Sequence, residues 1–531
     1  MQPPRALSVA VLLSICLLAS WQARNYFPFG VFNDDAAYWL QAQCLTGQRP
    51  ASDFPMGMFT YPTLGQGLML MAPSWAGQGN AEWGRLWMTL WAFVTGLAAF
   101  TLASDIFRLQ KAGAWDLRPF AVACFCVLNY SAFTHQTTLM SDSTLALVCL
   151  AYLALPENWP VQDKRWLYRG LLCAVAYYVR VTGIALLASE CVVLASRRQW
   201  KRLFWLIVGF LSLAAPYQTM LSLMRQGAQN YLTHASDDSS SVLSTLSNYF
   251  GHLPRLLGGT YFGDFSWSVY LGVFLIVTSL IGAFKLWIRN SNCDRKRVLF
   301  ATFFLLGHSI WPYPFGRYFI VVAPLLLALS LFPVPRITRV ACLLWVVFTL
   351  PGDTTVLARA KEVQPMLAPR NQIYPWLGKN CPPDFEISTV LDHRAAALSG
   401  RRVQKLQPAE STSGLIHHLA LSQVDWLLLE NTPLAQSLKG KRPVSFPAHL
   451  AHWLARSSLV RLILPTPWGT VYGLTPKADS LLSAYPRYLA ASRNVTRPAV
   501  AEAQLRAALE LCDDFPEAEE MLATILLEQN R

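Results

Sequence analysis

Long apolar runs alternate with short basic clusters over the first two-thirds of the chain. A helix needs about 20 mostly apolar residues to cross a bilayer, and fewer when it is kinked or anchored at its ends. Eleven runs approach this length, at 6–23, 86–107, 119–136, 139–155, 168–181, 183–196, 203–223, 267–288, 298–313, 318–333 and 337–351. Arg180 interrupts the pair between 168 and 196, which we expect to be two tilted or broken helices. The pattern predicts an α-helical polytopic membrane domain, residues 1–351, with about 11 transmembrane helices.

The loops between these runs differ in charge. Alternate loops carry the basic residues, for example Arg118, Arg165, Arg198, Lys296 and Arg336. Lys and Arg accumulate on the cytoplasmic side of membrane proteins. We therefore expect a multi-pass protein of the cell inner membrane, with a cytoplasmic amino terminus and a periplasmic carboxyl-terminal domain. The longer loops 24–85 and 224–266 are then outside, and they are poorer in positive charge.

The last third of the chain has the polarity of a soluble domain. Residues 352–478 contain short strand-like runs separated by helical stretches and Gly/Pro turns, which predicts an outward-facing α/β domain. Within it, Asp392-His393-Arg394 is expected to be a solvated turn, with acceptor binding as the alternative. Residues 479–531 end in two helical stretches broken at Phe515-Pro516, which resemble one tetratricopeptide-like hairpin. One such hairpin cannot bury its apolar face alone, so it caps the domain or docks to a partner.

Composition agrees with a membrane protein. Hydrophobic residues make up 53% of the chain and charged residues 14%, against about 25% charged residues in soluble proteins. The net charge of +13 could suggest nucleic acid as a partner. The basic residues flank apolar segments instead of forming one face, so we expect a lipid bilayer as partner and no nucleic acid.

A set of polar residues falls at the predicted outer ends of the spans. Charges within or beside spans are costly and usually functional. Because these residues are remote in sequence but share one predicted depth, we expect them to form a single site. They are Asp34, Asp35, Tyr38, Tyr61, His135, Asp142, Arg180, Arg317 and Tyr318.

Glycosyl transfer is the chemistry that this set suits. A carboxylate can remove the proton of an acceptor hydroxyl as it attacks an anomeric carbon, as in an inverting glycosidase. Arg180 and Arg317 could bind a departing lipid phosphate, because guanidinium matches phosphate oxygens in a bidentate way. Their positive charge would stabilise the negative charge of the leaving group.

The first outer loop resembles that of GT-C fold glycosyltransferases, which include protein O-mannosyltransferases and bacterial aminoarabinose transferases. The resemblance rests on Asp34-Asp35-Ala36-Ala37-Tyr38, on the later Tyr61-Pro62, and on Asp142, Arg180 and Arg317-Tyr318 in that order. It covers roughly residues 1–350. Thr63 stands where the family usually has a second proline. The resemblance implies a polyprenyl-phosphate sugar donor, and Asp34 or Asp35 as catalytic base. Asp35 is slightly preferred, because it directly precedes Ala36-Ala37-Tyr38.

The cofactor, the acceptor and the class of protein each have alternatives. Some relatives use a divalent metal, and Asp34, Asp35 and Asp142 could supply oxygen ligands, but we expect no required metal or other cofactor. The acceptor hydroxyl could belong to a glycan, a lipid or a protein. One alternative class is a transporter or flippase, although transporters usually place key polar residues at the midplane and often contain repeats. Another is a non-catalytic envelope assembly protein.

Overall fold

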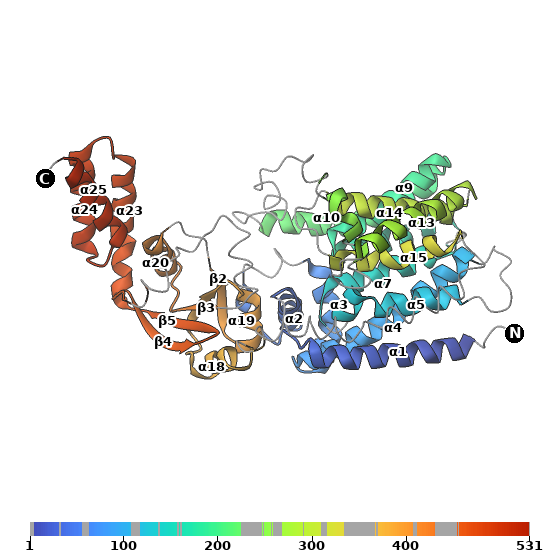
Figure 1. The fold of residues 1–531 in the computed structure, drawn as a ribbon, viewed down its shortest axis with the longest axis horizontal. Coiled ribbons are helices and arrows are strands. Elements are labelled where there is room, and N and C mark those ends of the chain that lie inside the picture. The colour runs from blue at the N-terminus through green and yellow to red at the C-terminus, as the bar shows by residue number, and fades with distance from the viewer. Residues whose placement is uncertain are drawn as a thin grey trace. The chain divides into compact units, whose positions relative to one another are not determined.

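A computed structural model of the chain describes residues 5–30, 33–55, 63–107, 117–135, 138–156, 159, 162–224, 247, 249–255, 257–258, 268–289, 291–309, 316–333, 367, 370–406, 411–430, 454 and 456–529. The chain divides into two compact units (Figure 1). Unit 1 comprises Met1–Phe29, Tyr38–Arg49 and Gly57–Lys361, and unit 2 comprises Gly30–Ala37, Pro50–Met56 and Glu362–Arg531. The amino-terminal loop thus contributes two short segments to the same unit as the carboxyl-terminal part of the chain.

Unit 1 is helical. Its helices are α1 (Arg5–Tyr26), α3 (Leu64–Ala76), α4 (Ala81–Phe107), α5 (Arg118–Leu128), α6 (Tyr130–His135), α7 (Ser141–Ala154), α8 (Trp166–Val179), α9 (Ile184–Ser196), α10 (Trp200–Met224), α13 (Ser268–Ile288), α14 (Asn292–Ser309) and α15 (Ala323–Leu331). Helix α2 (Asn33–Leu45) begins in unit 2 and continues into unit 1. Short 3₁₀ turns occur at η1 (Ala51–Asp53), η2 (Asp163–Arg165), η3 (Val181–Gly183) and η4 (Gly316–Val321).

The first ten predicted apolar runs all coincide with helices, and the eleventh, 337–351, lies outside the described residues. Three of the described helices are long and apolar enough to cross a membrane, namely Ala81–Phe107, Trp200–Met220 and Val269–Ile288. Large apolar side chains of α13 point away from the protein interior, with Leu280 64% and Phe284 66% exposed. Such a surface suits hydrocarbon and not water.

Two breaks between helices have a local reason. Asn129 separates α5 from α6, and its side chain donates to the carbonyl oxygens of Phe125 and Cys126 and accepts from the Ala132 N–H. These bonds satisfy backbone groups that the break would otherwise leave open. Arg180 ends α8 with an extended backbone, φ −154°, so the predicted pair of helices does meet at a polar turn.

Small residues allow helices α8 and α10 to pack backbone against backbone. A methyl group on Gly170 would lie 2.1 Å from the Leu206 carbonyl oxygen, and one on Gly209 would lie 2.1 Å from the Leu167 carbonyl oxygen. Close approach through small residues is typical of helix packing in membranes. The contact brings the carboxyl-terminal end of α8, which carries Arg180, to a fixed place in the bundle.

The helix ends next to the loops predicted to be cytoplasmic contact one another at one end of unit 1. Arg297 forms ion pairs with Asp105 and Asp294 and also donates to the Leu153 carbonyl oxygen. Arg289 donates to the Ile106 carbonyl oxygen across a separation of 183 residues. These contacts join the ends of α4, α7, α13 and α14, as the alternation of basic and poorly basic loops predicts.

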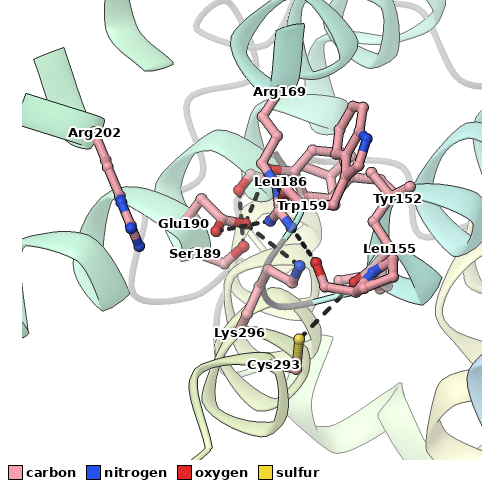
Figure 2. A network of polar contacts seen from close by, with 12 residues as sticks. Tyr152, Leu155, Trp159, Arg169, Leu186, Ser189, Glu190, Arg202, Cys293 and Lys296 are labelled. Atoms are coloured by element: carbon pink, nitrogen blue, oxygen red, sulfur yellow. Dashed lines mark hydrogen bonds and ion pairs between the residues drawn. The ribbon is translucent and has the colours of Figure 1, made fainter. Parts of the chain in front are cut away.

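A buried charged network lies near this end (Figure 2). Glu190 on α9 accepts from Arg169 at 3.1 Å and from the Tyr152 hydroxyl at 2.9 Å, and it lies 3.6 Å from the Lys296 Nζ. Glu190, Arg169 and Lys296 are 3%, 1% and 1% exposed. Arg169 also donates to the carbonyl oxygens of Trp159 and Pro156. Breaking such a pair leaves an uncompensated buried charge, so the network ties α7, α8, α9 and α14 together.

Unit 2 contains a five-stranded sheet of order β2-β1-β3-β5-β4. The strands are β1 (Glu386–Thr389), β2 (Arg402–Lys405), β3 (Trp426–Glu430), β4 (Val460–Thr466) and β5 (Gly469–Leu474). The first three are parallel, whereas β5 pairs antiparallel with both β3 and β4. Helices α18 (Ile373–Asn380), α19 (Asp392–Ser399) and α20 (Thr412–Leu421) belong to this part of the unit.

The carboxyl-terminal helices follow the sheet after η5 (Pro476–Asp479). They are α23 (Ser480–Arg493), α24 (Pro498–Leu511) and α25 (Pro516–Glu528). The break between the last two falls at Phe515-Pro516, the position predicted from the sequence. Phe515 is buried against the rings of Tyr485 and Tyr488. One apolar core runs from Ile416 of α20 to Ile525 of α25, so the terminal helices cover the α/β part in the manner of a cap.

Candidate functional site

A carboxylate between two arginines forms the charged centre of unit 1. Asp142 lies in the first turn of α7 and is 1% exposed. Its Oδ1 lies 3.0 Å from the Arg180 Nη1, and its Oδ2 lies 3.8 Å from the Arg317 Nε. The two guanidinium groups are 15% and 17% exposed. Asp142 thus brings two guanidinium groups to one place at the rim of the bundle.

Neighbouring side chains fix the two arginines. Arg180 donates to the Ser141 Oγ at 3.1 Å, and the same oxygen accepts from the Tyr38 hydroxyl at 2.8 Å. The Tyr318 ring lies under both guanidinium groups, with its centroid 4.7 Å from the Arg180 Cζ and 5.5 Å from the Arg317 Cζ. Cation–π contact and charge pairing thus hold both arginines in one orientation before any ligand binds. Ser141 was missed in the sequence, although it directly precedes Asp142.

One histidine contacts this cluster through the Tyr318 ring. His308 on α14 is 5% exposed, and its ring centroid lies 5.2 Å from that of Tyr318. The sequence did not single it out, although a histidine inside an apolar run is a usable signal. His135 ends α6, is buried, and its carbonyl accepts from the Thr138 hydroxyl. Tyr61, the remaining predicted residue of the first loop, lies outside the described residues.

The acidic pair of the first loop belongs to unit 2. Asp35 is fully buried, and its two oxygens accept from the Gly30 N–H at 3.0 Å and the Ala36 N–H at 2.8 Å. Burial raises the pKa of Asp35 to about 7, although both hydrogen bonds and the positive charge of Arg394 act in the opposite direction. Asp34 precedes it in the first turn of α2 and is half-buried. The helix dipole favours carboxylates at this position.

The segment Asp392-His393-Arg394 is not a solvated turn, so this expectation was wrong. Its three residues are 2%, 1% and 0% exposed. Asn33 supplies the reason, because its side chain donates to the Asp392 Oδ1 at 3.2 Å and accepts from the Arg394 N–H at 3.0 Å. The first loop, and not solvent, therefore supplies hydrogen bonds to the Asp392 carboxylate and to the Arg394 backbone.

The predicted residues thus form two groups. Tyr38, Asp142, Arg180, Arg317 and Tyr318 are connected through Ser141 and the Tyr318 ring in unit 1, whereas Asp34 and Asp35 lie in unit 2. As for metals, the described part of the chain contains no cluster of three or more His, Cys, Asp or Glu side chains placed to hold an ion.

Solved structures identify the fold. The structure of ArnT from Cupriavidus metallidurans bound to undecaprenyl phosphate matches with a TM-score of 0.58 at 14% identity, over 88% of this chain and 98% of that chain. The archaeal oligosaccharyltransferase AglB from Archaeoglobus fulgidus, in complex with an inhibitory peptide and a dolichol-phosphate, matches with a TM-score of 0.50 at 12% identity, over 88% and 74%. The apo form of the same ArnT matches with a TM-score of 0.57, at 14% identity and over 89% and 98%.

These matches show the fold, since both relatives are GT-C fold proteins and this chain shares their fold. The resemblance predicted from the first outer loop is confirmed. Residues 59–309 match the family described as Glycosyltransferase family 87. No curated protein sequence matches the chain. The family match supports a membrane glycosyltransferase.

Proposed function

We propose that this chain transfers a sugar from a polyprenyl-phosphate donor to an acceptor hydroxyl at the outer, periplasmic face of the cell inner membrane. The observation that carries the proposal is the Asp142, Arg180 and Arg317 cluster, which presents two partly exposed guanidinium groups, the groups that suit a phosphate, at one place. The fold is shared with a protein whose structure contains undecaprenyl phosphate. The basic loops support this orientation, because Lys and Arg accumulate on the cytoplasmic side and the cluster lies at the other end of the helices.

In this reaction the two arginines bind the phosphate of the donor. A polyprenyl-phosphate sugar is a phosphodiester with one negative charge, and the departing polyprenyl phosphate acquires a second partial charge. Fixed guanidinium groups stabilise that developing charge without reorganising at the moment of reaction. Asp142 holds both arginines toward the same point, and Tyr38 and Tyr318 border the place where the ligand would bind.

The acidic pair of the first loop supplies the base. The acceptor oxygen forms a bond to the anomeric carbon, the bond from that carbon to the phosphate oxygen breaks, and the electron pair leaves with the phosphate. The proton of the acceptor hydroxyl passes to a carboxylate. The sequence slightly favours Asp35, but Asp35 is fully buried and both its oxygens accept backbone hydrogen bonds. Half-buried Asp34 is the carboxylate that an acceptor can reach, so we propose Asp34 as base and Asp35 as its orienting partner.

Asp34→Asn and Asp35→Asn test this assignment in purified protein reconstituted in nanodiscs. The assay offers a panel of polyprenyl-phosphate hexoses and pentoses with cell-envelope extract as acceptor, and it measures covalent transfer and release of polyprenyl phosphate. We expect Asp34→Asn to lose about 100- to 10,000-fold in rate, the usual contribution of a general base. Arg402→Gln is a matched control, because it removes an exposed charge of unit 2 that pairs with Asp53.

Undiminished transfer in both single variants and in the double variant would exclude the pair as base. Movement of the lipid-linked sugar across the bilayer without covalent transfer would support a flippase instead. A protein that does neither, but whose deletion alters the envelope, would support the assembly role.

A further inference from the structure

The amino terminus of α19 is capped by a residue that lies 361 positions earlier in the chain. The first N–H groups of a helix have no partner within the helix, and the residue before α19 is Leu391, whose side chain is apolar. The Asn33 Oδ1 accepts from the Arg394 N–H at 3.0 Å, and the Asn33 Nδ2 donates to the Asp392 Oδ1 at 3.2 Å. Asn33 directly precedes Asp34 and begins α2. The cap and the acidic pair are therefore carried by the same turn.

Further contacts join the first loop to α19 within unit 2. Gly30 has φ +78°, and a methyl group there would lie 2.8 Å from the Leu398 Cδ1, so the loop passes directly over α19. Phe54 is buried and packs edge to face on the His393 ring, with centroids 4.9 Å apart. The loop is thus fixed on α19 both before and after the acidic pair.

We infer that the amino terminus of α19 is a positioning element of the transferase site, in which Asn33 orients Asp34 and the charge of Arg394 acts on Asp35. The inference rests on the proposed function and deepens it, because it makes the carboxyl-terminal α/β domain a part of the catalytic apparatus. Asn33 and Arg394 are positioning residues, since they act through the acidic pair.

The charges around Asp35 support this role. Burial is the main influence on the pKa of Asp35 and raises it, and the negative charge of Asp34 acts in the same direction. Arg394 is fully buried, and its positive charge lowers this pKa. Asp392 has its own partner in His393 at 3.0 Å, and its pKa is held below the usual value mainly by that contact. The Arg394 guanidinium, which also lies over the Tyr374 ring at 5.4 Å from its centroid, favours the ionised form of Asp35.

The test compares Asn33→Ala with Asn33→Ser, and Arg394→Met with Arg394→Lys, in the full-length protein. Asn33→Ala removes the cap, and we expect kcat for sugar transfer to fall about 10- to 100-fold, the loss that a misplacement of about 1 Å causes. The KM for the polyprenyl-phosphate donor should stay within about twofold, because donor-binding groups are untouched. Asn33→Ser should lose kcat like Asn33→Ala, because the serine hydroxyl is one bond shorter than the amide and cannot reach both the Arg394 N–H and the Asp392 Oδ1.

Arg394→Met provides a second measurement, the pH profile of kcat. A residue that only stabilises the fold would not change this profile. We expect its kcat profile to shift about one pH unit upward, because the ionised form of Asp35 loses a favourable charge. Arg394→Lys keeps the charge and should leave the profile in place. Arg402→Gln, whose side chain pairs with Asp53 in the same unit at 3.7 Å and is 54% exposed, should change neither kcat nor its profile.

Hydrogen exchange of residues 391–399 separates the possible outcomes. Faster exchange in Asn33→Ala and Asn33→Ser, together with the loss of kcat at an unchanged KM, supports the inference. Faster exchange with kcat unchanged would show that the cap only stabilises the domain, and unchanged exchange would show that no cap exists; either overturns the inference and leaves the proposed function standing. Absence of transfer by the unmutated protein with every donor would refute the proposed function itself.

Discussion

Replacing Arg180 by Gln removes the closer of the two cations that neutralise Asp142. At an effective dielectric constant of about 20, unit charges at the observed 3.0 Å attract each other by about 5.5 kcal/mol, and those at 3.8 Å by about 4.4 kcal/mol. Asp142 is 1% exposed, so the remaining charge cannot be solvated without opening the bundle. Breaking a buried pair usually costs about 3–5 kcal/mol, and the partial exposure of Arg180 reduces our expectation to about 2–4 kcal/mol.

The same distances predict a ranking of three variants. Arg317→Gln should destabilise the protein less than Arg180→Gln, because its Nε lies 3.8 Å from Asp142. Arg402→Gln should cost less than about 1 kcal/mol, because its ion pair is exposed to solvent. Thermal denaturation of detergent-solubilised protein, followed by intrinsic fluorescence, measures the ranking.

Added undecaprenyl phosphate extends the assay to function. A ligand at about 100 times its Kd stabilises the folded state by about 2.7 kcal/mol, so the denaturation midpoint of the unmutated protein should rise. We expect this rise to vanish in Arg180→Gln. An Arg180→Gln protein as stable as Arg402→Gln would refute the energetic reasoning. One that still responds fully to the lipid would refute the phosphate-binding role.

Three other changes have definite expected outcomes. Glu190→Gln leaves two buried cations without their carboxylate and should lower stability by about 3–5 kcal/mol, measured as the denaturation midpoint; a midpoint unchanged from that of the unmutated protein would mean that the network is neutral. Burial raises the pKa of Asp35 from 3.8 to about 7, so between these values the folded protein holds a proton that the unfolded chain has released. Stability contributed at this residue therefore falls as the pH rises from about 4 to about 7, by about 4 kcal/mol in all, and Asp35→Asn should flatten that part of the stability profile. Gly30→Ala forces a side chain into φ +78° and against Leu398, which should cost about 1–3 kcal/mol; proteolysis of the first loop should then become faster, and equal rates would argue against the close packing.

The sequence predicted the helices and the arginine cluster because both depend on regular, local signals. Apolar runs indicate the helices, and the basic loops indicate which side of the membrane each helix end faces. These two patterns alone assign Asp142, Arg180 and Arg317 to the same side. The Glu190 network was not predicted, because Lys296 stands in a basic cluster and looks like a loop residue. A single glutamate within IALLASECVVLAS was the available signal, since a lone acid in an apolar helix requires a buried partner.

The contact between the first loop and α19 could not be predicted from either segment. Asp392-His393-Arg394 is polar, and local reasoning places polar residues in water. Its burial depends on Asn33, and no pattern in one segment encodes the hydrogen-bonding needs of the other. The preference for Asp35 came from its place before Ala36-Ala37-Tyr38, and nothing in that local pattern indicated that Asp35 is the more deeply buried carboxylate.

The cap on α19 also sets an order of events during synthesis. Asn33 and the Arg394 N–H are 361 residues apart, and ribosomes add about 5–20 residues per second, so roughly 20–70 s separate the two partners. The first loop emerges early, but its hydrogen-bond partners do not exist until most of the chain has been made. The turn that carries the acidic pair therefore reaches its final form only when biogenesis of the chain is nearly complete.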